Sequence, residues 1–240
     1  MESQFECCLK FTRAEEGGYV ADPRDSGNWT SGHVGRGTLV GSNMGIGAPA
    51  LAAWMGADAP VTAAQMQMLP ISMFEAIARG RYWTPLECGV LPDGIDLMLF
   101  DFGWNRGIAT SLNILVRLLD LQRPNRVFEP ITIAQALQSV APDSLLSNMP
   151  ATAVRTLQLW LQVQQDGIAG PVTVRAFEQR PDLRIAAMIL ALSAAQIVSY
   201  QHLANFNVYG AGWLARSVRR RATSLSVARL ASTPRTPLRS

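Results

Sequence analysis

Apolar residues recur at helical spacing through most of this 240-residue chain, and one glycine-rich stretch interrupts the pattern. In that stretch, residues 19–47, glycines together with Pro23, Asn28 and Asn43 favour turns and short hairpins over helices. The pattern predicts a mainly α protein with a small irregular or β loop region near the front. Further helices are expected over residues 48–54, 62–79, 93–101, 108–121, 131–140, 150–165, 172–178 and 183–205.

The chain is expected to begin with a helix over residues 2–15, whose apolar side chains follow i, i+3, i+4 spacing. The pair Gly17 and Gly18 comes next, and glycine commonly ends a helix by adopting a left-handed conformation. Glu16 is therefore expected at the helix exit.

The charge of the chain is unevenly distributed. The formal net charge is +3, but no acidic residue follows Asp182 and seven arginines follow Gly212. Residues 213–230 have the pattern of an amphipathic basic helix, which could contact an anionic envelope or membrane. Alternatively, its apolar residues close a core and its arginines form a solvated face. Residues 223–240 are expected to be a basic, disordered tail, and no reader motif for a specific nucleic acid accompanies them.

Cysteine usage and hydropathy limit the class of protein. Cys7, Cys8 and Cys88 are an odd number without a CxxC motif, which favours free thiols and a reducing compartment. The N-terminus lacks the basic and apolar regions of a secretory signal. The apolar run 185–198 has 14 residues, fewer than a membrane span needs, so a buried core helix is expected.

Glu16, Asp22, Asp25 and Thr30 form the one compact set suited to glycosidic bond cleavage. That reaction needs a carboxylic acid to protonate the leaving oxygen and usually a second carboxylate. Glu16 lies at the negative end of a helix dipole and beside Glu15, which should keep its carboxyl protonated. The alternative is that these are surface glutamates followed by an Asp-Pro turn.

Other chemistries lack their motifs. His33 and His202 are the only histidines, and neither HExxH nor another zinc spacing is present. Neither GxxxxGK[ST] nor GxGxxG appears, so the phosphate-cradling loops are missing. No metal and no cofactor are therefore expected.

Several segments, in order, resemble the glycoside hydrolase family 108 muramidases. The run EEGGYVADPRDSGNWTSG at 15–32 is similar to the opening of that family, and two later segments resemble its Gly-Ile-Ser/Thr, Tyr-Trp and Phe-Asp-Phe-x-x-Asn-x-Gly motifs. QDGIAGPVTVRAF and YGAGWLARSV resemble its peptidoglycan-binding half. The five segments are residues 15–32, 39–56, 81–107, 165–177 and 209–218.

The resemblance implies a lysozyme-like reaction on the β-1,4 bond between N-acetylmuramic acid and N-acetylglucosamine. Glu16 would be the general acid. The nine-residue step to Asp25 and the later Thr30 also resemble the Glu, Asp, Thr arrangement of phage lysozymes, so by analogy Asp25 would be the base or electrostatic stabiliser and Thr30 a residue that positions water. Relatives often have His at the position of Glu15 and Asp-Pro-Gly-Gly where this chain has Asp-Ser-Gly-Asn. The residues expected to bind substrate are Tyr19, Tyr82, Trp83, Asp166, Gly167 and Gly170.

The resemblance also implies an organisation and a setting. A catalytic part over residues 1–90 would precede a helical peptidoglycan-binding part over residues 91–222. A phage endolysin of this kind is made in the cytoplasm of the bacterial host without a signal peptide, and acts on peptidoglycan in the periplasm. A holin or a secretion system would export it. The alternative is a non-catalytic peptidoglycan-binding or virion structural protein on the same scaffold.

Overall fold

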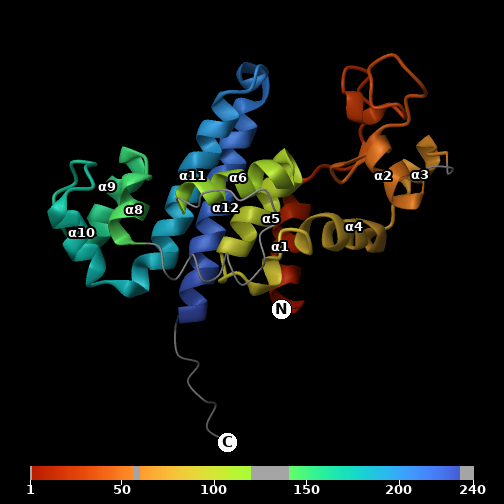
Figure 1. Cartoon of the computed structure of the whole chain (residues 1–240). Helices are drawn as coiled ribbons and strands as arrows, with labels where there is room; N and C mark the ends of the chain where they lie inside the picture. The colour runs from red at the N-terminus through yellow and green to blue at the C-terminus, as the bar shows by residue number, and fades with distance from the viewer. Residues whose placement is uncertain (1, 57–59, 120–140, 233–240) are drawn as a thin grey trace, which may run out of the picture. The chain divides into compact units, whose positions relative to one another are not determined.

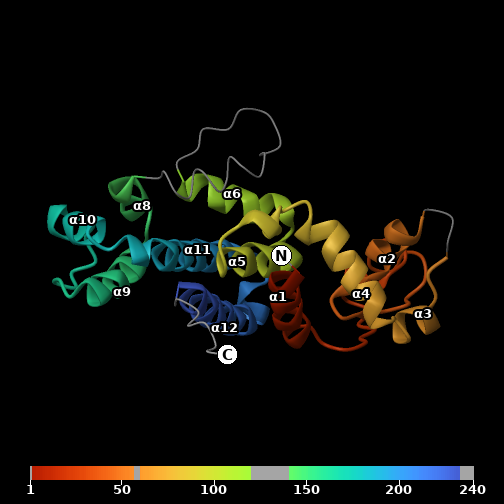
Figure 2. The ribbon, with the colours of Figure 1, turned by 90° about the horizontal axis from the view of Figure 1, so that it is seen from below.

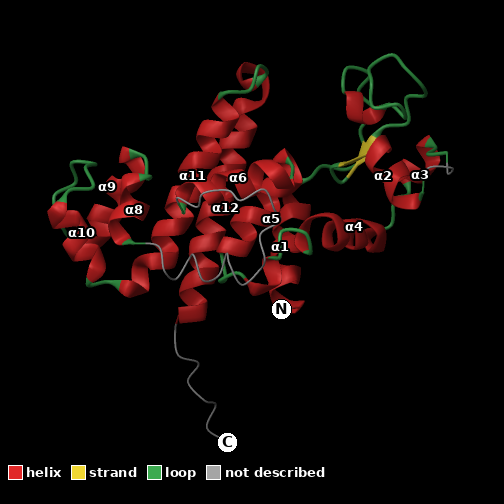
Figure 3. Cartoon of the chain, viewed as in Figure 1, coloured by secondary structure: helices red, strands yellow, loops and turns green. Residues whose placement is uncertain are grey.

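The computed structural model describes residues 2–56, 60–119 and 141–232, and it confirms the mainly α fold. Helices dominate, and two short strands are the only strands in these described ranges (Figures 1 and 3). Packing divides the chain into two compact units, one formed by Leu9–Thr84 and the other by the residues before and after that segment. The division predicted at residue 90 stays a prediction.

The unit formed by Leu9–Thr84 combines a loop region with short helices. Its two strands, β1 (Ser42–Asn43) and β2 (Ile46–Gly47), pair antiparallel, and isolated bridges join Val20 to Ser42 and Trp29 to Leu39. Five glycines between residues 32 and 45 have positive φ, which explains why glycine is so frequent there. The other elements are the 3-10 turn η1 (Ser26–Asn28), α2 (Ala48–Met55), α3 (Ala63–Gln67), α4 (Ile71–Ala78) and the π-helical turn η2 (Arg79–Trp83).

The single helix predicted over residues 62–79 is two helices. Thr62 and Gln65 form a capping box that starts α3, and Pro70 is the N-cap of α4. Proline lacks a backbone N–H and fits the start of a helix far better than its interior. The first helix therefore ends before Pro70, and a second helix begins after it.

The other unit is a helical core centred on α5 (Ile95–Arg106). Residues 95–104 of α5 are all buried, because α6 (Ile108–Leu118), α11 (Arg184–Gln201) and α12 (Phe206–Ser232) pack against it. Figure 2 shows α5 and α11 as a middle layer between α6 and α12. The start of α1 (Glu2–Glu15) joins this core through Phe5, whose ring meets Phe100 edge-on.

Three short helices complete this unit: α8 (Pro142–Ser147), α9 (Ala151–Leu161) and α10 (Pro171–Glu178). Short 3-10 turns also occur at Cys88–Val90 and Pro181–Leu183. The segment Pro181–Gln201 is long and apolar enough to cross a membrane, but half of its most apolar window is buried inside the fold. Its packing against α5, α6, α9 and α12 fits the core helix expected there. The helix expected over residues 131–140 lies outside the described residues.

The predicted disordered tail is wrong for its first ten residues. Residues 223–232 continue α12 as regular helix, and Ser224 and Ala228 are buried. This part of the helix is therefore packed against the fold along the side of Ser224 and Ala228, which propensity alone did not indicate. Residues 233–240 lie outside the described part of the chain.

Candidate active site

Glu16 lies directly after α1, as the sequence predicts. Its backbone N–H donates to the carbonyl of Thr12 over 3.1 Å, so the last turn of the helix holds its backbone. The side chain is half-buried. The expected left-handed glycine is not observed, since neither Gly17 nor Gly18 has a positive φ. The helix therefore ends without a left-handed glycine cap.

Tyr82 lies within electrostatic range of Glu16. It lies in η2, where α4 widens into a π-helical turn, a feature often found at functional sites. Burial raises the pKa of the Tyr82 phenol, the cation of Arg81 opposes this, and the negative charge of Glu16 raises it further. The phenol therefore stays protonated at neutral pH and lies within electrostatic reach of the predicted acid.

The same turn contacts an aromatic side chain that sequence reasoning did not single out. The guanidinium carbon of Arg81 lies 5.9 Å from the ring centre of Trp54, a residue of α2. Gly80 lies against that ring too, because a Cβ there would come within 2.8 Å of it. In the sequence, the one indication of this close contact was Gly80, a glycine at the end of a helical run. Trp83 is 6% exposed, so it offers a sugar little of its ring.

Asp22 forms an ion pair with Arg24. Its carboxylate accepts bonds from Nε and Nη2 of Arg24 at 3.0 and 2.8 Å and from the Arg24 backbone N–H at 2.9 Å. These bonds to the Arg24 side chain and backbone lower the pKa of Asp22 to about 2. Asp22 is therefore a permanently ionised turn residue, in line with its position before Pro23.

Asp25 is exposed and caps η1. Its Oδ1 accepts the N–H of Gly27 over 2.9 Å, which leaves Oδ2 without a bond among the described residues. Oδ2 of Asp25 can therefore still accept a hydrogen bond from a substrate or a water. The structure shows no direct bond between Asp25 and Glu16.

Thr30 and Tyr19 are both tied to the loop. Oγ1 of Thr30 accepts the N–H of Thr38 over 3.0 Å, and the hydroxyl of Tyr19 donates to the carbonyl of Val40 over 3.2 Å. The ring of Tyr19 lies so close to Gly41 that a Cβ there would come within 2.5 Å of it. These contacts fix the loop that carries Asp25; the expected roles of Thr30 and Tyr19 toward substrate stay predictions.

In the other unit, the predicted binding loop is held by an internal hydrogen-bond network. Oδ1 of Asp166 accepts from the N–H of Ile168 at 2.8 Å and from Nε2 of Gln158 at 2.7 Å. Oε1 of Gln158 accepts the N–H of Gly167, whose φ is +79°. Gly170 is the N-cap of α10. Asp166 and Gly167 thus build the turn, and their contact with the wall stays a prediction.

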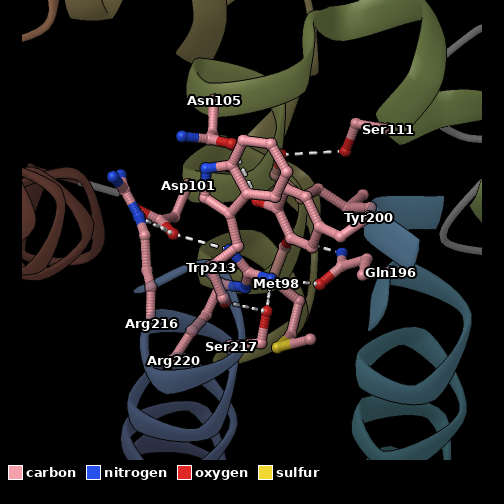
Figure 4. Close-up of polar contacts among 11 residues, drawn as sticks. Met98, Asp101, Asn105, Ser111, Gln196, Tyr200, Trp213, Arg216, Ser217 and Arg220 are labelled. Atoms are coloured by element: carbon pink, nitrogen blue, oxygen red, sulfur yellow. Dashed lines mark hydrogen bonds and ion pairs between the residues drawn. The ribbon is translucent and has the colours of Figure 1, made fainter. Parts of the chain in front are cut away.

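Two of the motif segments meet in a buried ion pair network (Figure 4). Asp101 of α5 accepts bonds from Arg216 at 2.7 and 3.1 Å and from Arg220 at 2.8 Å. Burial opposes ionisation, but the two guanidinium groups hold the pKa of Asp101 below its usual value. Arg220 also donates to Gln196 of α11, and Tyr200 donates to Asn105.

This network corrects the interpretation of the basic C-terminus. Arg216 and Arg220 are buried, at 6% and 0% exposure, and bind Asp101. They cannot form a cationic face on a membrane or a solvated face, because α12 turns them into the core. The expected contact with an anionic envelope through this segment therefore has no support.

Comparison with known proteins agrees with the motif segments. Residues 9–107 match the family model described as Glycosyl hydrolase 108, and residues 152–218 match that of the Predicted Peptidoglycan domain. No curated protein matches the chain. The solved structure of Brucella abortus SagA is similar, with 25% sequence identity, a TM-score of 0.54, and coverage of 95% of this chain and 98% of that one.

The match to Glycosyl hydrolase 108 contains Glu16, Asp25, Thr30 and the turn η2, and it extends through α5 to Gly107. The second match contains the loop of Asp166 and Arg216, one of the two arginines that bind Asp101; Arg220 follows it by two residues. The N-terminal part of the chain therefore belongs to the glycosyl hydrolase 108 family, and its C-terminal part is a peptidoglycan domain, which makes the protein a peptidoglycan-acting glycosidase.

Proposed function

We propose that this glycosidase is a muramidase, which hydrolyses the β-1,4 bond between N-acetylmuramic acid and N-acetylglucosamine with Glu16 as the general acid. The observation that carries the proposal is the placement of Glu16. It is a half-buried carboxyl at the end of a helix, within electrostatic range of the protonated phenol of Tyr82 and inside the segment that matches the glycosidase family.

The reaction assigns one role to each group. Glu16 donates its proton to the glycosidic oxygen as the bond to the leaving sugar breaks, and positive charge develops on the ring that remains. Asp25 faces that charge as a carboxylate, or takes the proton of an attacking water held by Thr30. Asp22 is unsuited to this role because Arg24 already neutralises it and holds its pKa near 2.

Tyr82 lies within electrostatic range of the acid, and Trp54 packs against the turn that carries Tyr82. Tyr82 is half-buried and its hydroxyl remains a donor at neutral pH, so it can bind a sugar by its ring and its O–H together. The cation of Arg81 over Trp54 keeps the π-helical turn in place. The second domain would keep the enzyme on its insoluble substrate and raise the local concentration of bonds to cut.

Mass spectrometry of digested wall tests the bond assigned. Purified peptidoglycan is digested with the full chain, the products are reduced with borohydride, and their ends are identified. The proposal expects muramitol ends. Glucosaminitol ends, anhydro-muramyl ends or freed peptides would assign another bond or another reaction, and an undigested wall would favour a binding protein without catalysis.

A further inference from the structure

A cavity of about 680 Å³ lies in the unit that contains α5, α6 and α11, and none of its lining residues belongs to the proposed reaction. It is bounded by α6, by α11 and by the connection between α8 and α9 at Asn148 and Pro150. Its volume is in the range of sites that hold small organic ligands. Figure 2 shows α6 and α11, its two long walls, as neighbours.

The polar side of this cavity is cationic. Arg106 and Arg117 line it together with His202, and no carboxylate lies among the described residues that line it. Neither arginine has a hydrogen bond or an ion pair in the described ranges, and Nε of Arg106 is buried without a partner. A buried donor without a partner costs free energy, so a ligand acceptor placed there would bind favourably.

A second unsatisfied atom extends the polar wall. Oδ1 of Asn113, on α6, is buried and accepts no bond from any residue that the structure describes. Asn148 uses its amide nitrogen on the carbonyl of Ser144, and Nδ1 of His202 is bonded to the carbonyl of Val198. The cavity therefore offers a buried acceptor beside buried and exposed donors, a pattern that suits a ligand carrying both a carboxylate and an amide N–H.

Most of the remaining lining is apolar, with the hydroxyls of Thr110 and Ser199 as exceptions. Ile114 and Leu118 on α6 and Ala195 and Val198 on α11 provide surface for small alkyl groups. An elongated sugar would leave its many hydroxyl groups poorly paired against such a lining. A short peptide with methyl side chains, amide groups and free carboxylates would match both sides of the cavity.

We propose that this cavity holds the stem peptide of peptidoglycan, with a peptide carboxylate on Arg106 and Arg117 and an amide N–H on Asn113. The inference rests on the proposed function for its source of ligand, since the wall substrate carries such peptides on its muramic acid units. Arginine binds carboxylates through two parallel N–H donors, so each arginine adds orientation as well as charge. The helical unit that contains α6 and α11 would then bind the peptide, while the unit formed by Leu9–Thr84 acts on the glycan.

Calorimetry with soluble wall fragments tests this binding. The full chain is titrated with the disaccharide tetrapeptide released from peptidoglycan, and with the same disaccharide stripped of its peptide. Binding is expected for the first and not for the second. Arg106→Gln and Arg117→Gln should each weaken binding about ten- to hundred-fold, the loss expected for one charge-assisted bond.

The matched control is Arg175→Gln, which removes the same charge from an exposed site on α10 outside the cavity lining. Its binding should equal that of the wild type. Arg117 is exposed, so its variant remains informative if Arg106→Gln unfolds. Unchanged binding in the Arg117 variant, equal losses in the control, or binding of the peptide-free disaccharide would overturn the proposal, as would displacement of the peptide by equimolar inorganic phosphate.

The same preparations separate this inference from the proposed muramidase. Product ends are measured on whole wall, and peptide binding is measured on a fragment that has no internal muramidase bond left. A chain that binds the tetrapeptide through Arg117 but yields no muramitol ends would support the peptide site and contradict the muramidase. A chain that yields muramitol ends but binds the peptide equally in all variants would support the muramidase and contradict the peptide site.

Discussion

Arg220 and Asp101 form a buried ion pair between α12 and α5. Nη1 of Arg220 lies 2.8 Å from Oδ2 of Asp101, 119 positions earlier in the chain, and both side chains are completely buried. Arg220 comes from the residues that follow the peptidoglycan match, and Asp101 from within the glycosidase match. The pair therefore makes the end of the glycosidase segment part of the C-terminal helical core.

Asp101→Asn should destabilise the protein severely. The change leaves Arg216 and Arg220 buried without their shared counter-charge, and breaking a buried pair in this way typically costs about 3–5 kcal/mol. Denaturant unfolding followed by circular dichroism measures the loss. As a control, Asp182→Asn breaks the exposed pair with Arg180 and should change stability little. Equal effects of the two changes would contradict the structural role of the buried network.

Asp96→Asn should stabilise the protein at neutral pH. Burial raises the pKa of Asp96 to about 6, so the folded state holds a proton that the unfolded chain, with a pKa near 3.8, releases. The stability that this carboxyl contributes is therefore complete below about pH 3.8 and is lost as the pH rises through 6. Oδ1 of Asp96 accepts both N–H groups, of Gly94 and Leu97, and an asparagine oxygen can keep both.

The gain from Asp96→Asn should reach up to about 3 kcal/mol at pH 7, the equivalent of two pKa units. At pH 3.5 the variant and the wild type should unfold at similar denaturant concentrations. Unfolding curves at the two pH values make the comparison. A variant that is equally or less stable at pH 7 would show that the Asp96 carboxylate is better accommodated than its burial indicates.

The helices were largely predictable from the sequence, because amphipathic spacing reports burial directly. The buried arginines were not. Arg216 and Arg220 lie four positions apart on one helix face, but their partner is a residue of α5 more than a hundred positions away. An arginine cluster is solvated unless a carboxylate is buried opposite it, and a single sequence does not show that pairing. The one signal was Asp101 itself, an acid inside the apolar run DLMLFDF.

The candidate site was predictable in part for similar reasons. The helix exit at Glu16 follows from local patterning, and the turn chemistry of Asp22 follows from Pro23. The contact of Arg81 with Trp54 and the proximity of Tyr82 to Glu16 depend on the π-helical turn after α4. A π-helical turn adds one residue to a turn of helix and so rotates every later side chain about the helix axis. No residue type in the sequence predicts where such a turn occurs.

Asp25→Asn should reduce wall hydrolysis more than Asp22→Asn. Asp25 has an unbonded carboxylate oxygen in the loop, whereas Asp22 is neutralised by Arg24. If Asp25 acts as base or stabiliser, its amide should lower the rate by about 10²-fold or more, while the Asp22 variant should stay within a few-fold of wild type. Turbidity loss of a wall suspension gives both rates, and a larger loss for Asp22 would reverse the two roles.

Tyr82→Ala should weaken substrate binding more than Tyr82→Phe. Phenylalanine keeps the ring that could stack on a sugar, and alanine removes it. The alanine variant should raise KM on soluble glycan chains about tenfold or more, and the phenylalanine variant should raise it only a few-fold. Steady-state kinetics separate the two cases. Equal losses would assign the function of Tyr82 to its hydroxyl.

The rate of Glu16→Gln tests the central claim most directly. Glutamine keeps the size of the side chain and removes its titrating proton, so release of reducing ends from purified peptidoglycan should fall by about 10²- to 10⁴-fold. The variant should unfold at the same denaturant concentration as the wild type and should still pellet with the wall. A folded Glu16→Gln variant that retains more than about a tenth of the wild-type rate would contradict its assignment as the general acid.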